Sequence, residues 1–215
     1  MNSHLTRKIS LFLFLLSSII CSQKKPITID DILGGRTMWG SGSYNNLQWF
    51  DSGNKFSFVR SNKETGSSDI CEYDIATGNE SVIVSDNDLK INKDDKPFRI
   101  SNYKWSPDDN LILFTGKLPA RSLKTGGAFY LYDIKNKKFS LLVGSEKEQS
   151  NVQFSPDSKM IGFVRENNLF VLDIRTLTEK QLTFDGSINI INGQFDWVYE
   201  EEFSIISGWE WSPDS

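Results

Sequence analysis

Between Lys25 and the end of the chain, apolar and polar residues alternate over short stretches, and no long stretch has the periodicity of a helix. The clearest stretches are 56–59, 111–114 and 160–164, and each is bounded by Asp, Asn, Gly, Ser or Pro. Alternation of this kind between turn-forming residues is typical of short antiparallel strands. The pattern therefore predicts an all-β fold.

One sequence unit recurs along this part of the chain. An aromatic residue followed by Ser-Pro-Asp, and then by a predicted strand, begins at Trp105 and at Phe154. A further copy begins at Trp211, and a looser copy without proline begins at Trp49. The copies are spaced by about fifty residues, which suits one four-stranded blade of a β-propeller.

A second element follows in each unit, where a strand ends in Asp-Ile-x-Thr or Asp-Ile-x-Asn at Asp74, Asp133 and Asp173. An Asp in this place caps the turn of a hairpin with its side chain. We therefore expect residues 46–215 to form a partial β-propeller, after a lead-in segment over residues 23–45. The alternative is an all-β sandwich, but three Ser-Pro-Asp turns in the same place relative to the strands disfavour it.

The units amount to three complete blades and the opening of a fourth. A closed propeller has at least four blades and typically up to eight. Residue 215 also lies inside a turn motif that elsewhere leads into a strand. We therefore expect the chain to be part of a longer protein.

The start of the chain resembles a secretory signal. Arg7 and Lys8 precede an apolar run over residues 11–20, which is too short to span a bilayer comfortably. We expect cleavage to remove residues 1–22 and the protein to be secreted or periplasmic. A lipid anchor on Cys21 is the less favoured alternative, because the isoleucine before it is larger than such sites accept.

Charge and residue usage narrow the candidate chemistry. The net charge of −4, with no cluster of Lys and Arg, argues against binding to nucleic acid. The one histidine, His4, lies in the predicted signal, so the mature chain has no Ser-His-Asp site and no histidine-ligated zinc of its own. Cys71 is the one cysteine outside that signal. We expect no catalytic residue, metal ligand or cofactor site in this chain.

An acidic segment over residues 192–203 interrupts the repeat. Asp196 is a suitable N-cap, and the glutamates at 200–202 favour a short helix. Such a run is ordinarily a solvated surface, but three large rings flank it here: Trp197, Tyr199 and Phe203. We expect the rings to anchor the helix, so that a fixed pair of carboxylates can receive a cation such as an ammonium group.

Residues 196–202, Asp-Trp-Val-Tyr-Glu-Glu-Glu, resemble the double-glutamate motif of dipeptidyl peptidase IV, a branch of the prolyl oligopeptidase family of serine peptidases. The resemblance implies an eight-bladed propeller over an α/β-hydrolase domain. It also implies that Glu201 and Glu202 bind the free amine of a peptide, so that dipeptides are released, preferentially after Pro or Ala. The acidic segment is specific to this family, whereas Ser-Pro-Asp turns occur in many propellers.

The resemblance implies a third substrate-binding residue. The family places an arginine over the substrate ahead of a Tyr-x-x-Tyr-Asp strand, and Arg121 precedes the similar sequence 129–133. Residues 122–127 depart from the usual spacing. An exposed loop arginine without a role stays the alternative.

The resemblance implies that the parent protein is a serine exopeptidase and that this piece is inactive alone, because it lacks the Gly-x-Ser-x-Gly elbow. Its implied partners are peptides with a free N-terminus and the C-terminal hydrolase domain, and a homodimer of the full-length protein is left open. A non-catalytic, TolB-like periplasmic propeller that binds proteins is the alternative function. Other oligopeptidases and aminoacyl peptidases of the superfamily are disfavoured, because they lack the glutamate pair.

Overall fold

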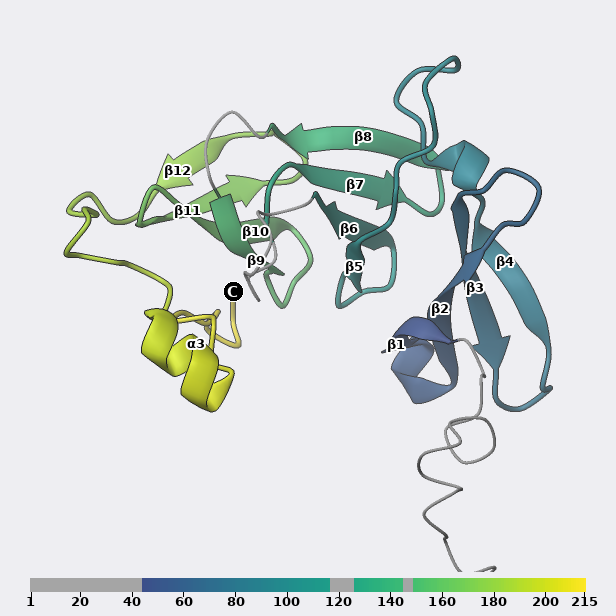
Figure 1. The fold of residues 1–215 in the computed structure, drawn as a ribbon, viewed down its shortest axis with the longest axis horizontal. Helices are drawn as coiled ribbons and strands as arrows, with labels where there is room; N and C mark the ends of the chain where they lie inside the picture. The colour runs from purple at the N-terminus through teal and green to yellow at the C-terminus, as the bar shows by residue number, and fades with distance from the viewer. Residues whose placement is uncertain (1–43, 117–125, 145–148) are drawn as a thin grey trace, which may run out of the picture. The chain divides into compact units, whose positions relative to one another are not determined.

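The computed structural model describes residues 44–116, 126–144 and 149–215, and these residues form three four-stranded antiparallel sheets (Figure 1). Each sheet is a meander in which consecutive strands are neighbours. Blade 1 contains β1 (Asn45–Phe50), β2 (Lys55–Ser61), β3 (Ser68–Asp74) and β4 (Glu80–Val84). Blade 2 contains β5 (Asn102–Trp105), β6 (Leu111–Thr115), β7 (Phe129–Asp133) and β8 (Lys138–Val143). Blade 3 contains β9 (Gln149–Phe154), β10 (Met160–Arg165), β11 (Asn168–Asp173) and β12 (Glu179–Gln181).

The remaining elements are short. Two 3-10 turns, η1 (Asp51–Gly53) and η2 (Asp86–Asp88), lie in or next to blade 1, and one α-helix, α3 (Trp197–Phe203), follows blade 3. The three sheets and the short helix confirm the predicted partial β-propeller with an inserted acidic helix. They exclude the alternative of an all-β sandwich, because each four-stranded sheet corresponds to one repeat unit of the sequence.

The register shows why the motif recurs. In every blade the aromatic residue at the start of the motif pairs with the second residue of the next strand: Trp49 with Phe56, Trp105 with Ile112, and Phe154 with Ile161. The aromatic residue therefore occupies the same place in each sheet.

Neighbouring blades share apolar cores. The first core joins blades 1 and 2, with buried members Val59, Ile70, Val84, Leu89, Tyr103, Ile112, Phe114, Tyr132 and Phe139. The second joins blades 2 and 3, with buried members Leu113, Phe129, Leu131, Val143, Val152, Ile161, Phe163, Phe170 and Leu172. Each blade thus buries a face against its neighbour, as the blades of a propeller do.

Side-chain size is matched across these interfaces. Ser57 of blade 1 meets the ring of Tyr103 in blade 2, with 2.8 Å between the hydroxyl oxygens. Gly162 stands at the corresponding position of blade 3, where a Cβ atom would overlap the ring of Trp209. A small residue on one blade thus receives a large ring from the next segment, which keeps the interface close-packed.

The Ser-Pro-Asp turns are stabilised by their own side chains. Ser155 Oγ donates to Asp157 Oδ1 at 2.7 Å and accepts the Met160 N–H at 2.9 Å. Ser106 makes the same two bonds, at 2.6 and 2.9 Å, to Asp108 and Leu111. The hydrogen bonds from Ser155 and Lys159 hold the pKa of Asp157 well below its ordinary value.

Each turn also contacts the turn of the next unit. The Asp51 N–H donates to Asp109 Oδ2 at 2.9 Å, and the Asp108 N–H donates to Ser158 Oγ at 3.1 Å. The Asp157 N–H donates to Ser215 Oγ at 3.1 Å, although the last unit forms only its opening turn within the described residues. The repeat is therefore continued by side chains from one turn to the next.

The hairpin aspartates cap their turns as the sequence predicts. Asp74 Oδ1 accepts the Thr77 N–H at 2.9 Å, and Asp173 Oδ1 accepts the Thr176 N–H at 2.7 Å. Asp133 accepts the Asn136 N–H at 2.8 Å. The bonds from the Thr77 and Thr176 N–H groups stabilise the carboxylate form, so they hold the pKa of Asp74 and of Asp173 below the ordinary value.

Two sequence-based expectations concern other parts of the chain. The predicted signal at residues 1–22, with Cys21, and nearly all of the lead-in segment lie outside the described residues. Within the described part of the chain, no helix is long and apolar enough to cross a membrane. Cys71 is a buried free thiol, and burial raises its pKa, so this cysteine packs as a core residue of β3.

Candidate functional site

The acidic helix forms where the sequence predicts it. Asp196 is the N-cap of α3, and its Oδ1 accepts the N–H groups of Val198 at 3.0 Å and Tyr199 at 3.3 Å. Ser204 ends the helix in the left-handed conformation, with its N–H donating to the carbonyl of Tyr199. The seven-residue helix is therefore capped at both ends by its own segment.

Within the part of the chain that the structure describes, the flanking rings do not anchor the helix, which corrects the sequence-based expectation. None of the residues of α3 is buried, and Trp197 and Phe203 are 71% and 63% exposed. Phe195, Tyr199 and Phe203 instead stack in a row, with ring centroids 5.0 and 5.8 Å apart. Residues four apart lie on one side of a helix, so these rings stabilise α3 internally and do not attach it to the sheets.

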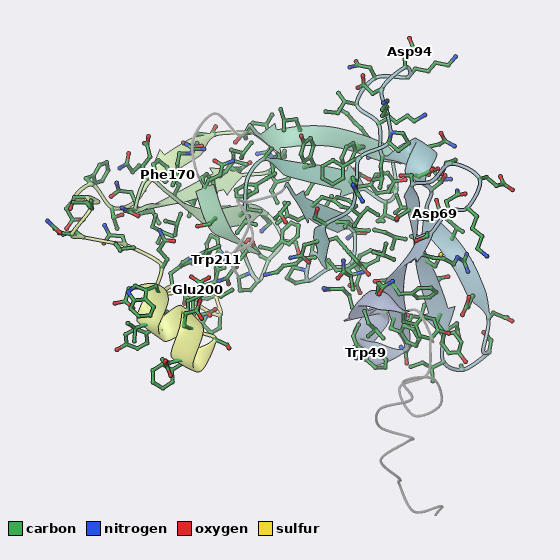
Figure 2. All side chains as sticks on the ribbon, in the orientation of Figure 1. Trp49, Asp69, Asp94, Phe170, Glu200 and Trp211 are labelled. Atoms are coloured by element: carbon green, nitrogen blue, oxygen red, sulfur yellow. The ribbon has the colours of Figure 1, made fainter. Side chains whose placement is uncertain are left out.

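The glutamates differ in exposure. Glu201 and Glu202 are exposed and Glu200 is half-buried. Within residues 44–116, 126–144 and 149–215, neither Glu201 nor Glu202 has an ion-pair partner. Figure 2 shows the side chains of α3, with Glu200 labelled, standing out from the yellow helix. The arrangement offers two consecutive carboxylates to a cation.

The segment on each side of α3 forms a stem. Gln194 and Ser207 form an isolated antiparallel bridge, and the Gly208 N–H donates to the Gly193 carbonyl at 3.1 Å. We call residues 195–205 the α3 loop, and the paired segments 192–194 and 206–208 the loop stem. The stem closes the two ends of the loop against each other.

The first strand of the stem is fixed to the β10–β11 turn by Asn167. The Asn167 carbonyl accepts the Asn192 N–H at 3.0 Å, and its Oδ1 accepts Gln194 Nε2 at 3.1 Å. Gly193, between these two, has a φ of +76°. A Cβ there would lie 2.7 Å from Val164 Cγ2, so both the conformation and the space require glycine.

The second strand of the stem is fixed to β9. Asn151 Nδ2 donates to the Ile206 carbonyl at 3.0 Å, and Gln153 Nε2 donates to Ser207 Oγ at 2.9 Å. Sequence reasoning missed these amide side chains. One signal was present, because asparagine recurs three residues before the aromatic residue of the motif in the three complete units, at Asn46, Asn102 and Asn151.

The repeated asparagine has a shared role in two of the units. Asn46 Nδ2 donates to the Ser101 carbonyl just before β5 at 3.2 Å, as Asn151 does to Ile206. Both asparagines have positive φ, 52° and 55°, in a strand irregularity that only such residues adopt readily. The asparagine ties the first strand of a blade to the segment that opens the next.

The third predicted substrate-binding residue, Arg121, lies outside the described residues. The sequence 129–133 that follows it forms β7, a central strand of blade 2. The structure therefore describes the setting of Glu201 and Glu202 and not that of Arg121.

Successive four-stranded blades with an acidic loop after the third define a partial β-propeller region. Residues 120–215 match the family model described as the dipeptidyl peptidase IV (DPP IV) N-terminal region. The chain therefore carries the N-terminal propeller region of the dipeptidyl peptidase IV family.

Individual relatives agree with this assignment. The chain is 29% identical to dipeptidyl peptidase 4 of Sus scrofa over 174 residues, 78% of this chain and 21% of that protein. It is 30% identical to the probable dipeptidyl-aminopeptidase B of Arthroderma otae over 203 residues, 88% of this chain and 22% of that protein. The chain thus spans about a fifth of the length of these curated relatives.

A solved structure gives the same answer for the fold. The crystal structure of Porphyromonas gingivalis dipeptidyl peptidase 4 matches with a TM-score of 0.62 at 29% identity, covering 86% of this chain and 26% of that one. TolB from Acinetobacter baumannii matches with a TM-score of only 0.43 at 23% identity, a likeness that carries no argument about function.

Proposed function

We propose that the full-length protein is a serine exopeptidase that releases N-terminal dipeptides, and that this region binds the free amine of the substrate through Glu201 and Glu202. The supporting observation is the capped helix α3, which presents two exposed carboxylates without ion-pair partners among the described residues, in a dipeptidyl peptidase IV-type propeller region. The relatives that match are dipeptidyl peptidases by name.

The proposed mechanism measures the substrate from its amine. A peptide ammonium has three N–H donors, which the carboxylates of Glu201 and Glu202 can share. Two extended residues span at most about 7 Å, so holding the amine fixes which peptide bond reaches the nucleophile. The bond that is cut then follows the second residue, with Pro or Ala preferred there.

The chemical step belongs to the proposed C-terminal α/β-hydrolase domain, which would supply the nucleophilic serine, the aspartate and the histidine. Arg121 is proposed as a further contact to the substrate from blade 2. The contribution of this region is binding and orientation, which lower the barrier by positioning the scissile bond.

The test compares two substrates in the full-length protein, a Gly-Pro reporter with a free amine and the same reporter with the amine acetylated. Glu201→Gln combined with Glu202→Gln should lower kcat/KM for the free-amine reporter by roughly 30- to 100-fold, because charge-assisted hydrogen bonds to the ammonium are lost. The exposed Glu64→Gln, in the β2–β3 turn, is the matched control and should have no effect.

Two results would reject the amine-binding assignment. One is full activity of the double variant on the free-amine reporter. The other is equal cleavage of the acetylated and free reporters by the unaltered protein, since a site that binds ammonium cannot bind an acetamide as tightly.

We also propose export of the protein through residues 1–22, with the mature chain released into the periplasm or medium. Mass spectrometry of the exported protein should give an unmodified N-terminus near residue 23. A mass increase that disappears in Cys21→Ser would instead support a lipid anchor.

A homodimer of the full-length protein is proposed by resemblance alone, and light scattering would test it.

A further inference from the structure

We propose that Asn167, in the turn between β10 and β11, is a positioning residue that fixes the α3 loop on blade 3 and thereby sets the direction of Glu201 and Glu202. The functional part of this inference rests on the amine-binding role proposed above. The structural part, that Asn167 holds the loop, stands by itself.

Within the described residues, α3 has no buried face that would fix its direction. No residue of the helix is buried, and the rings of Tyr199 and Phe203 pack against each other and, with Phe195 before the helix, form a row apart from the sheets. A helix of seven residues without a buried face gains little from packing and is marginal by itself. Among the described residues, its direction is therefore set where the α3 loop joins the rest of the chain, at the loop stem.

Asn167 makes hydrogen bonds to three residues of the segment before α3. Its Nδ2 donates to the Ser187 carbonyl at 2.9 Å, and its Oδ1 accepts Gln194 Nε2 at 3.1 Å. Its carbonyl accepts the Asn192 N–H at 3.0 Å. Removing the side chain therefore frees two of the three attachments at once.

The backbone conformation of the β10–β11 turn orients Asn167. Asn167 has a φ of +59°, in the left-handed region that asparagine tolerates better than most residues. This conformation is what directs both its amide and its carbonyl toward residues 187–194. The turn belongs to the six-pair β10–β11 ladder, so Asn167 is presented from a rigid part of blade 3.

The loop stem connects Asn167 to the glutamates of α3. Gln194 receives the contact from Asn167 and forms the backbone bridge to Ser207. The opposite strand is already tied to β9 through Asn151. Loss of the Asn167 side chain therefore leaves the first strand of the stem bonded to Asn167 only through the Asn192 N–H, and the carboxylates can then sample a wider range of directions.

The first measurement is amide hydrogen exchange in the full-length protein, and it makes no use of activity. Asn167→Gly removes the side chain and keeps the positive φ without strain. Exchange in peptides covering residues 195–206 should become about tenfold faster, while exchange in β10 and β11 stays unchanged. Unchanged exchange over residues 195–206 would overturn the proposal.

The second measurement is the ratio of kcat/KM for a free-amine Gly-Pro reporter to that for its des-amino analogue. Asn167→Gly should lower this ratio about tenfold, with kcat/KM for the des-amino analogue unchanged. Asn167→Asp keeps the oxygen that accepts from Gln194 and should recover most of the ratio. A merely structural role would lower both reporters together and would overturn the positioning role.

Matched variants separate the possible failures. Leu177→Gly is the control, because Leu177 is exposed, has a φ of +57° and lies in the next turn of the same blade. It should change neither measurement. If Asn167→Gly does not fold, Gln194→Ala removes the same bond from the loop side and should give the same two effects.

The outcome for the glutamates distinguishes this inference from the proposed function. If the Glu201→Gln, Glu202→Gln double variant lowers the reporter ratio and Asn167→Gly does not, the positioning role is wrong and the amine site stands. If neither lowers the ratio, the amine site fails, and the hydrogen-exchange result alone decides whether Asn167 holds the loop.

Discussion

The Ser-Pro-Asp turns and the α3 loop are both exposed connections, yet they are stabilised in opposite ways. In the turn of blade 3, Ser155 and Asp157 satisfy each other and the neighbouring backbone, within six residues of sequence. In the α3 loop, the helix caps itself but is held to the blade by residues far away along the chain, Asn167 and Asn151. Local bonds build each turn, which is then joined to the next turn by one further bond, whereas the α3 loop depends on distant residues for its attachment.

The largest effect should come from filling the space between blade 3 and Trp209, the residue that follows the loop stem. Gly162→Val would place side-chain atoms where the ring of Trp209 lies. Overpacking of this kind should lower the free energy of unfolding by about 3 kcal/mol. Denaturant unfolding of the full-length protein measures it, with Gly53→Ala as a control in an open turn at a modest conformational cost. Unchanged stability would mean that the stem segment moves away without cost.

The second largest effect is expected when the serine side chain of a Ser-Pro-Asp turn is removed. Ser155→Ala removes the hydroxyl that donates to Asp157 and leaves the Met160 N–H without its acceptor. Because Ser155 is fully buried, the loss should be about 2 kcal/mol of global stability. Thermal unfolding checks this, and the exposed Ser81→Ala on β4 serves as the comparison. An equal effect of both variants would count against the buried turn network.

A smaller and strictly local effect is expected at α3. Asp196→Ala removes the acceptor for the N–H groups of Val198 and Tyr199. The cost should be about 1 kcal/mol, confined to the helix. Hydrogen exchange over residues 197–203 should become faster, while the melting temperature of the blades stays the same. A lower melting temperature would show that the helix contributes to the scaffold.

The smallest effect is expected on the melting temperature at acid pH. Hydrogen bonds hold the pKa of Asp74 and Asp173 below their ordinary values, with the Thr77 and Thr176 N–H groups as the main causes. Their contribution is fully present above the ordinary Asp pKa of about 4 and is lost as pH falls through the lowered folded value. Asp74→Asn with Asp173→Asn should therefore flatten the decline of melting temperature between pH 5 and pH 2. A decline as steep as in the unaltered protein would reject the assignment.

The same difference decides what the sequence could predict. The strands, the three Ser-Pro-Asp turns and the Asp196 cap were predictable, because each signal lies within a few neighbouring residues. The anchoring role of Trp197 and Phe203 was predicted wrongly, since a ring's size says nothing of what covers it. Asn167 and Asn151 were missed because their partners lie 27 and 55 residues away, at Gln194 and Ile206.

The paired sizes at the blade interfaces have a consequence for how the chain assembles. Ser57, Leu113 and Gly162 place a different volume at the third position of the second strand in three successive blades, where Ser57 meets Tyr103 and Gly162 lies against Trp209. A blade transplanted to another junction would meet a partner that is too bulky or leaves a void. The blades share one architecture but are not interchangeable, so the linear order of the repeats is enforced by steric fit as well as by chain connectivity.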